Sequence, residues 1–344
     1  TLKVLLLNNM LVVYVSVIAV TALNVRTQAF NFLGAVVIGI GQAITPTVGM
    51  FYGEEDRTAI KDTLKTTIRI GMTIVLCLSI LVFALSGVFP KLMGVKDADT
   101  INMAKMALRF FAVSIPVYLF NTILVNYYQC TKKVGMATMI CVLQSFVYTV
   151  SFAFGLVRVF GANGVWCAFL VGELATTITT FIVIFIRNKK ISLRLTDIML
   201  LDEKFGGDPK DRLEISIGNN MEEVIMISTG IHKFFENREI DEKNMNTIAL
   251  VVEEMAGNVV KHAFKPGEKR WLDVTIIDKS EIIILRLRDN GAPFDPLAYL
   301  SKGTGDTYGI KMIHALTENF EYRRSMGLNN LIIYLKNTAS EYKR

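Results

Sequence analysis

The sequence predicts an all-α membrane bundle of about six transmembrane helices, followed by an α/β sandwich. Three observations support this fold class. Mean hydropathy is +0.41, which is high for a soluble chain. Charged residues make up 20% of the 344 residues and crowd the second half, which indicates two domains in different solvents. Long apolar segments end near residue 190, and shorter runs with strand and helix periods follow.

The first half contains six apolar segments, each long enough to cross a hydrocarbon core of about 30 Å. A buried soluble bundle would show amphipathic helices with polar faces, whereas these segments are apolar nearly all round. We therefore assign residues 1–190 to the membrane. The predicted spans are Leu2–Leu23, Phe30–Tyr52, Thr66–Phe89, Ala104–Tyr128, Val134–Val157 and Val165–Ile186.

Lys and Arg residues in the short loops predict the orientation. If the second half is cytoplasmic, ten of them lie at inner loops and six at or near outer ones, which is a modest positive-inside bias. We expect a multi-pass protein of the cell (inner) membrane with a cytoplasmic C-terminal domain. The net charge of +6 belongs largely to these flanking residues, so no nucleic-acid partner is expected.

A few polar residues interrupt the apolar segments. Glu173 is the one carboxylate well inside a segment, and ionisable groups there are functional candidates. It can equally face a wet cavity or a polar partner. The cysteines have no metal-ligand spacing and are expected to pack as small apolar residues. Interhelical hydrogen bonding is the expected role of Gln42, Asn121, Asn126 and Gln144.

The passage Gly39–Asp56 combines small residues, which let helices approach closely, with Pro46, which frees a backbone carbonyl. It is similar to the second helix of a half-unit in the multidrug and toxic compound extrusion (MATE) transporters. Helix number and loop spacing fit one six-helix half. Those transporters have two halves around a central cavity, so the resemblance implies a first half upstream of Thr1. It also implies a small-molecule or cation substrate.

Residues 191–209 read as a juxtamembrane linker. Ile191–Leu201 mixes apolar positions with charges and predicts a short interfacial helix, and Phe205–Pro209 then breaks the chain. The second domain is assigned to residues 210–344.

Alternation predicts a strand at Leu213–Ile217. A capping box formed by Asn220 and Glu223 predicts a helix to about Asn237, and Asp241 is placed to cap the helix that follows. Four more strands are expected, with one helical layer on a largely antiparallel sheet. They are Trp271–Asp278, Glu281–Asp289, Phe320–Ser325 and Leu331–Leu335, the last two turned by Gly327–Asn329.

Chemistry is concentrated on the predicted helix Glu253–Phe264. Residues three or four apart share a helix face, so Glu254, Asn258 and His262 line up, with Lys261 beside them. The amide carbonyl of Asn258 is a hard oxygen ligand suited to Mg²⁺. The carboxylate of Glu254, one turn away, can orient a hydroxyl or water for attack on a phosphate. A solvated helix face is the alternative interpretation.

Two further stretches favour the functional interpretation. Arg288–Pro296 follows a strand-like run and contains Asp289 and Gly291. The glycine-rich stretch Gly303–Ile310 opens onto a short amphipathic helix. The order is therefore carboxylate-x3-Asn on a helix, a strand, an Asp-x-Gly turn, and a glycine loop before a helix.

This order resembles the Bergerat-type ATP-binding domain of the GHKL superfamily, which includes gyrase, Hsp90, histidine kinases and MutL. Within it the chain looks most like the anti-sigma-factor serine kinases. The closer match rests on two segments: residues 289–296, which read Asp-Asn-Gly-Ala-Pro-Phe-Asp-Pro, and Gly327–Leu331. The resemblance covers roughly residues 210–338. Pro293 stands where the second glycine of Asp-x-Gly-x-Gly is usual, and anti-sigma-type members commonly have proline there.

The resemblance implies ATP and Mg²⁺ as cofactors. Asn258 would hold the metal against the triphosphate, and Lys261 would lend charge to the phosphates. Glu254 would position or deprotonate a substrate hydroxyl. His262 would either contact a phosphate or pack against the sheet.

The adenine is expected at the Asp-x-Gly turn. Asp289 would accept a hydrogen bond from its exocyclic amine, and Gly291 would let the base approach the backbone. The glycine loop would form a mobile lid whose N–H groups face the phosphates. Its nucleotide-binding residues are predicted to be Gly303, Thr304, Gly305 and Gly309.

The leading hypothesis is a membrane-tethered ATP-binding regulator, either a serine kinase or an ATPase. It would act as an anti-sigma-type switch on a STAS-type (anti-anti-sigma) or sigma-factor partner, with a dimer through the ATP domain as a further partner. The alternative is a MATE-type cation-coupled efflux transporter whose ATP domain gates flux. A sensor histidine kinase would need an acceptor histidine before the ATP domain, yet the histidines are His232, His262 and His314. ABC-type pumping is disfavoured because no Gly-x4-Gly-Lys-Ser/Thr loop is present.

Overall fold

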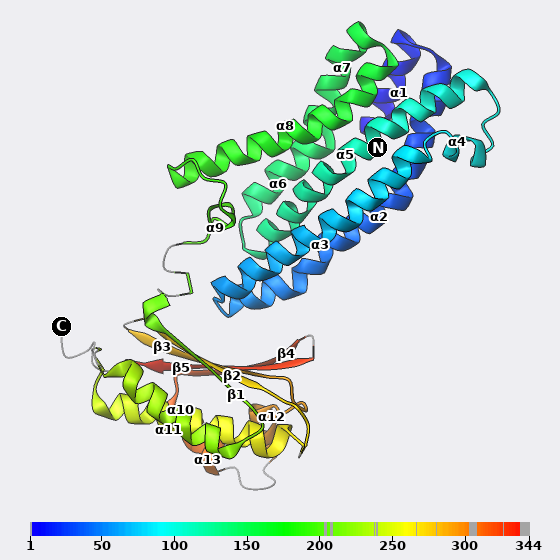
Figure 1. Ribbon diagram of the computed structural model, residues 1–344. Helices are drawn as coiled ribbons and strands as arrows, with labels where there is room; N and C mark the ends of the chain where they lie inside the picture. Colours follow the sequence, from blue (N-terminus) through cyan, green and yellow to red (C-terminus); the bar gives the residue numbers. More distant parts are fainter. Residues whose placement is uncertain are drawn as a thin grey trace. The chain divides into compact units, whose positions relative to one another are not determined.

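The computed structural model describes residues 2–202, 205–206, 209–236, 238, 240–265, 267–279, 281–302, 308–325 and 327–337 (Figure 1). The chain divides into two compact units, residues 1–201 and 202–344, and each is described by itself. The division falls within the stretch expected to be a linker.

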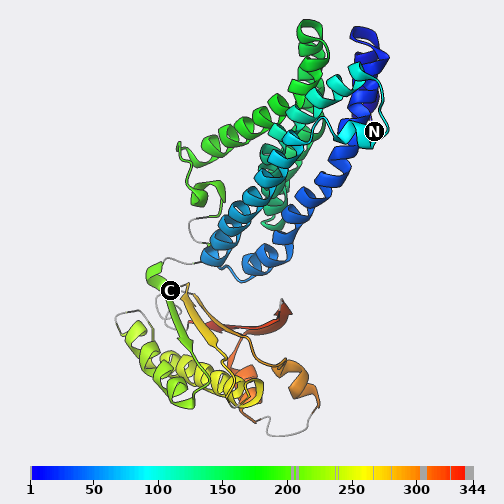
Figure 2. The same ribbon diagram turned by 45° about the vertical axis from the view of Figure 1, so that its right-hand side comes forward.

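The first unit is entirely helical among its described residues, and its long helices run side by side in both ribbon views (Figures 1 and 2). In the part of the chain that the structure describes, five helices are long and apolar enough to cross a membrane: α2, α3, α5, the continuous segment Val134–Phe160, and α8. The elements are α1 (Leu2–Tyr14), α2 (Val17–Gly53), α3 (Arg57–Ala84), α4 (Phe89–Leu92), α5 (Ala98–Cys130), α6 (Val134–Val142), the π-helix η1 (Leu143–Val147), α7 (Tyr148–Phe160), α8 (Ala162–Asn188) and α9 (Leu195–Ile198).

The start of the bundle differs from the sequence prediction. The first two predicted spans were separated by residues 24–29, but α2 runs unbroken through them and α1 is a shorter apolar helix of 13 residues. The reason lies with Arg26, whose charge suggested a connector. Its guanidinium carbon lies 3.8 Å from the ring centroid of Phe169 and 4.9 Å from that of Phe111. Aromatic faces attract the cation, so the helix continues past it.

Close packing of α2 against its neighbours uses one glycine of the predicted small-residue passage. A Cβ on Gly41 would lie 2.8 Å from Cγ2 of Thr122 on α5, whereas Gly39 and Gly49 have open space around them. The long helix α5 packs against α2, α3 and α8, and so forms the centre of the bundle. The predicted interfacial helix shrinks to the four residues of α9.

The second unit is the predicted α/β sandwich. Its five strands are all paired antiparallel in the order β1-β2-β3-β5-β4. Helices α10, α11 and α13 cover one face of the sheet (Figure 1). The elements are the 3-10 helix η2 (Pro209–Asp211), β1 (Arg212–Ile217), α10 (Met221–Phe235), α11 (Glu242–Asn258), the π-helix η3 (Val259–Ala263), β2 (Leu272–Asp278), β3 (Ile282–Asp289), α12 (Pro296–Lys302), α13 (Tyr308–Leu316), β4 (Asn319–Ser325) and β5 (Leu328–Lys336).

The core of this unit lies between the sheet and the helical layer. Alternate residues of β2 and β3, such as Val274 and Leu285, point to that face and are buried. The inward stripe of α11 includes Val252 and Met255, which are also fully buried. Burying each such side chain contributes about 1.5–3 kcal/mol. This rigid layer holds α11 beside the end of β3.

Local capping signals are only partly as expected. Asp241 caps α11, with Oδ1 accepting from the Asn244 N–H at 2.6 Å, and Asn220 caps α10 through the Glu222 N–H at 2.9 Å. The reciprocal half of the predicted capping box is wrong, because Glu223 accepts from the Gly218 N–H at 2.7 Å instead. The turn before β5 is also shorter than predicted. Gly327 adopts φ +82° and the strand begins at the next residue.

The bundle makes a prediction about sidedness. If each long helix crosses once, residues 54–56, residues 131–133 and the end of α8 share one side, which the charge bias places in the cytoplasm. In a chain without its native cysteines, Val134→Cys, a 62% exposed position, should react with an impermeant maleimide only after cells are permeabilised. Exposed Lys96→Cys should react on intact cells and serves as the control. Labelling of Val134→Cys from outside would overturn the topology.

Candidate functional site

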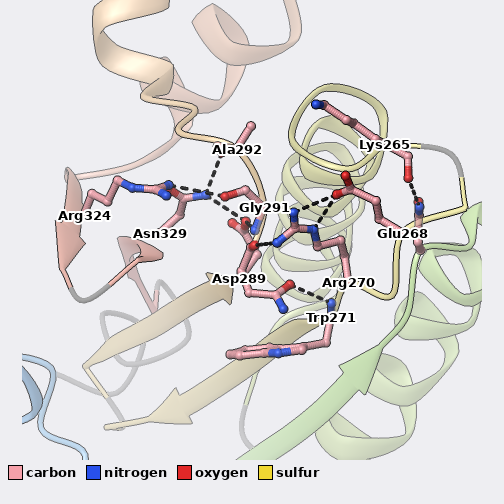
Figure 3. Close-up of polar contacts among 11 residues, drawn as sticks. Lys265, Glu268, Arg270, Trp271, Asp289, Gly291, Ala292, Arg324 and Asn329 are labelled. Atoms are coloured by element: carbon pink, nitrogen blue, oxygen red, sulfur yellow. Dashed lines mark hydrogen bonds and ion pairs between the residues drawn. The ribbon is translucent and has the colours of Figure 1, made fainter.

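Asp289 ends β3 with a carboxylate that is 3% exposed. Both of its hydrogen bonds fall on one oxygen: the Gly291 N–H and the Asn329 side-chain amide each donate to Oδ1 at 2.8 Å (Figure 3). Within the described parts of the chain, nothing donates to Oδ2. Burial raises the pKa of this carboxyl above its ordinary value, while the bonds from Asn329 and Gly291 oppose the rise. One oxygen of a carboxylate on a buried residue is therefore left for a ligand.

Asn329 holds Asp289 in place from β5, where the two residues are cross-strand partners. Its Nδ2 donates to Asp289 and, at 2.9 Å, to the Ala292 carbonyl. Its Oδ1 accepts from the Tyr322 hydroxyl at 2.8 Å and from Arg324 at 2.6 Å. The amide thus uses all four of its hydrogen-bonding positions, which fixes its orientation.

The turn after β3 is pinned to the end of the central helix. A Cβ on Gly291 would lie 2.6 Å from the carbonyl oxygen of Ala263, and the Ala292 N–H donates to that oxygen at 2.8 Å. The prediction gave Gly291 the role of admitting the base. The structure adds that no side chain fits between this turn and Ala263.

The other side of the turn is tied to the start of β2. Arg270 donates to the Asn290 carbonyl at 2.5 Å, and the Trp271 N–H donates to the Asn290 side-chain oxygen at 3.0 Å (Figure 3). Glu268 in turn accepts from Arg270 at 2.8 Å. The turn is therefore preorganised from both sides.

Glu254 and Asn258 share one face of α11, as predicted from their spacing. Asn258 Nδ2 donates to Glu254 Oε1 at 3.4 Å, which leaves the Asn258 carbonyl oxygen without a donor in the part of the chain described. Both side chains are partly exposed. The side-chain oxygen of Asn258 is therefore available, and oxygen is the ligand type that a hard cation requires.

The predicted α-helix through Phe264 is wrong in its last turn. The α-helix ends at Asn258 and Val259–Ala263 form a π-helix, so residues beyond Asn258 leave the α-helical spacing. His262 does not pack against the sheet. Its exposed ring stacks on Phe294, with centroids 5.8 Å apart and planes at 23°. Lys261 is exposed. Single π turns are frequent at functional sites.

Helix α13 meets the candidate catalytic carboxylate. A Cβ on Gly309, in the first turn of α13, would lie 2.1 Å from Glu254 Oε1. The start of this helix therefore stands directly over Glu254, where its N–H groups favour anions. The predicted lid residues Gly303, Thr304 and Gly305 lie outside the described residues.

The second aspartate of the motif is structural. Asp295 Oδ1 accepts from the N–H groups of Leu297 at 2.9 Å and Ala298 at 3.2 Å, and so caps α12. Pro296 occupies the first helical position, which suits its missing N–H. The Asp-Pro pair thus ends the turn and starts a helix.

No cluster of three or more His, Cys, Asp or Glu side chains converges to hold a metal in the described ranges. Mg²⁺ commonly takes one or two protein oxygens and completes its shell with phosphates and water. The side-chain oxygen of Asn258 is of the type that this ion takes, and its role as a metal ligand stays a prediction.

Sequence reasoning missed Asn329 as a site residue. The signal was available, since Gly327 marks a turn into a strand that must pair with the end of β3. We expect Asn329→Ala to lower the free energy of unfolding of the second unit by about 1–3 kcal/mol, because it removes one of the two donors to the buried Asp289 carboxylate and the side-chain donor to the Ala292 carbonyl. Hydrogen exchange of β3 and β5 amides in the full chain measures this. Asn319→Ala, an exposed amide on β4, should change exchange little; equal protection in both variants would contradict the role.

Two family models match this sequence. MatE covers residues 4–155, and the Histidine kinase-like ATPase domain covers residues 219–335. The serine/threonine-protein kinase BtrW of Bordetella bronchiseptica is 28% identical over 95 residues, which are 25% of this chain and 67% of that protein. The chain therefore joins a MatE region, in a multi-pass membrane unit, to a histidine kinase-like ATPase domain.

One solved structure agrees with the membrane fold. A MATE protein in the bent conformation matches at 15% identity with a TM-score of 0.50, covering 75% of this chain and 57% of that one. An inward-facing multidrug resistance MATE family transporter matches at 16% identity and 0.49, covering 75% and 58%. This chain spans a little over half the length of these transporters. At such identities the first likeness concerns the fold alone.

Proposed function

We propose that this fusion is a membrane-tethered, ATP-dependent serine/threonine kinase of the anti-sigma type that acts on a STAS-type partner. The observation that carries the proposal is the position of Glu254. Its carboxylate lies between Asn258 on its own helix and the first turn of α13 at Gly309. A kinase needs a carboxylate of this kind beside the place where phosphates bind. The likeness to a serine/threonine kinase supports the same class.

The adenine end of the nucleotide fits the Asp289 turn. The unused Oδ2 of Asp289 would accept from the exocyclic amine, and Asn329 would keep that oxygen aimed at the base. A buried, rigid acceptor gives specificity, because an analogue without the donor leaves it unpaired.

The phosphate end would lie where the start of α13 meets α11. Asn258 would ligate Mg²⁺ through its side-chain oxygen, and the N–H groups of α13 would face the phosphates. Lys261, which is exposed, is free to swing toward the same charge. Bound ATP would supply the γ-phosphoryl group that is transferred, and Mg²⁺ would offset the negative charge of the phosphates.

Glu254 would act on the partner's hydroxyl. One of its oxygens, Oε1, accepts from Asn258, which fixes the carboxylate near the metal ligand. The second oxygen would accept the proton of an incoming serine hydroxyl as the serine oxygen attacks the γ-phosphorus. The bond between the γ-phosphorus and the β,γ-bridging oxygen would break, and ADP would leave. Enzymes of this kind rely chiefly on positioning and charge stabilisation, and the carboxylate orients the nucleophile.

The test is transfer of radiolabelled phosphate from Mg-ATP by the purified full chain to STAS-domain proteins. Phosphoserine or phosphothreonine on such a partner is the expected product. If the chain binds ATP but labels no protein, the kinase is excluded, and the domain is a nucleotide-gated binding module or an ATPase.

Gly309 offers a separate prediction. Gly309→Ala places a methyl group against Glu254 and must displace that flexible carboxylate or the start of α13. We expect phosphate transfer to fall about tenfold or more, since small misplacements of catalytic groups are costly, while ATP affinity changes by less. Gly257→Ala on α11 is the matched control, because its nearest neighbour would be 3.7 Å away. Full transfer activity in Gly309→Ala would show that this contact is not part of the catalytic arrangement.

A further inference from the structure

A cavity of about 690 Å³ lies inside the membrane unit, far in sequence from the ATP site and unused by the proposed kinase chemistry. Its walls come from α1, α2, α5, η1, α7 and α8. Three side chains of the Lys, Arg, Asp and Glu type line it: Lys3, Arg26 and Glu173. Such groups within a bilayer are costly and mark ligand or ion sites.

The two cations of this cavity rest on aromatic rings. Arg26 lies over Phe169, Phe111 and Phe30 at 3.8, 4.9 and 5.3 Å from the ring centroids, and the Lys3 amine lies 5.9 Å from the Phe169 centroid. In the described residues, neither cation forms an ion pair, and the buried Nε of Arg26 makes no hydrogen bond. An unpaired guanidinium retains its capacity for bidentate binding of an anion.

An amide fixes the position of Glu173 in the wall of the cavity. Asn121 Nδ2 donates to Glu173 Oε2 at 2.9 Å and to the Glu173 carbonyl at 3.1 Å. Asn121 Oδ1 accepts from the Thr177 hydroxyl at 2.9 Å, which fixes the amide. With all three groups ionised, the cavity therefore carries two positive charges against one negative charge.

The rest of the lining is apolar with a polar strip. Leu7, Leu23 and Phe30 contribute apolar surface. The π-helix η1 places Gln144 and Ser145 on the wall, and Gln144 Nε2 donates to the Tyr118 carbonyl at 3.4 Å. A ligand that fits this cavity thus has a charged end and an apolar body.

We infer that the cavity binds an amphiphilic anion, with a carboxylate or phosphate head at Arg26 and Lys3 and an apolar body along the aromatic rings. The anion supplies the negative charge that the lining lacks and gives the buried guanidinium its hydrogen-bond partner. This is the opposite charge preference from the cation substrate that the MATE resemblance implies. The inference is independent of the kinase proposal, since it uses none of the ATP-site residues.

The test uses the full chain in nanodiscs of neutral phosphatidylcholine and three dansyl-labelled alkyl probes that differ only in head group: carboxylate, neutral amide and amine. We expect saturable binding with the order carboxylate, amide, amine from tightest to weakest. Arg26→Gln should weaken carboxylate binding about 10- to 100-fold, the scale of a lost charged hydrogen bond. Arg158→Gln is the matched control, because Arg158 stacks on Phe154 at 3.9 Å but does not line the cavity.

A second variant guards against misfolding. Glu173→Gln removes the negative charge from the lining and should tighten carboxylate binding several-fold, an effect that unfolding cannot produce. Tightest binding of the amine, or unchanged carboxylate affinity in Arg26→Gln, would overturn the inference. Adding phosphatidylglycerol to the nanodiscs separates the sources of the anion. Competition with the probe indicates a lipid ligand, and lack of competition indicates a free amphiphile.

Discussion

Replacing Glu254 with glutamine is expected to lower phosphate transfer by about 10²- to 10⁴-fold, the usual cost of losing a general base. ATP affinity should stay within a few-fold of the wild type. Glutamine keeps the size of the side chain and an oxygen that can accept from Asn258, which donates to Glu254 at 3.4 Å. It removes the charge that would take a proton from the attacking hydroxyl. The loss should therefore appear in the chemical step rather than in binding.

The measurement is radiolabelled transfer from Mg-ATP to a STAS-type partner or to water, with binding followed in parallel by calorimetry on the same samples. Glu253→Gln is the matched control. Glu253 is the adjacent carboxylate on α11, is exposed, and should tolerate the change. If both variants transfer at the wild-type rate, Glu254 is not the base. If both lose ATP binding equally, the helix has been disturbed and the comparison must move to Glu254→Asp.

The site shows which features a sequence can predict. Asp289, Gly291, Glu254 and Asn258 could be proposed as site residues from the sequence because each sits in a short motif whose chemistry depends on local spacing. Asp241 was found as a cap for the same reason, since an N-cap bonds residues two or three positions away. Residues that act through neighbours close in sequence are accessible to pattern reasoning.

Features that depend on distant contacts were not accessible. Arg26 interrupts an apolar run, and only the rings of Phe111 and Phe169, from two other helices, explain why α2 continues through it. The π turn at Val259–Ala263 carries no pattern distinct from an α-helix, yet it moves His262 out of the predicted row. Asn329 gains its role from a strand pairing across 40 residues.

Asp289→Asn is expected to weaken ATP binding by about 1–3 kcal/mol, or roughly 5- to 150-fold. In the wild type the Gly291 N–H and the Asn329 amide both donate to Oδ1 of Asp289. The asparagine side chain has one oxygen, and both donors would bond to it. The amide nitrogen would then stand where Oδ2 stood and oppose the exocyclic amine of adenine, donor against donor. Because the shape is kept, the second unit should still fold.

Calorimetry with Mg-ATP on the full chain measures this loss. Asp273→Asn on β2 is the control, since Asp273 is a partly exposed strand carboxylate that bonds Ser216 and lies outside the turn. An inosine nucleotide, which carries a carbonyl in place of the amine, should bind the wild type weakly and lose little further in Asp289→Asn. Unchanged ATP affinity in Asp289→Asn would remove this residue from the nucleotide site.

The pH dependence of ATP binding and of folding stability tests the same site, because the direction of each change can be predicted. Burial raises the pKa of Asp289, and the adenine amine needs the ionised form. ATP affinity should therefore be constant well above that pKa and fall as the pH drops through it, and the fall should vanish in Asp289→Asn. The contribution of Asp289 to folding stability without nucleotide depends on pH in the opposite direction. A raised pKa means that the folded state binds the proton more tightly, so this contribution to stability is full below the ordinary pKa and is lost as the pH rises through the raised one. A stability profile and a binding profile that slope in the same direction over this range would contradict the assignment.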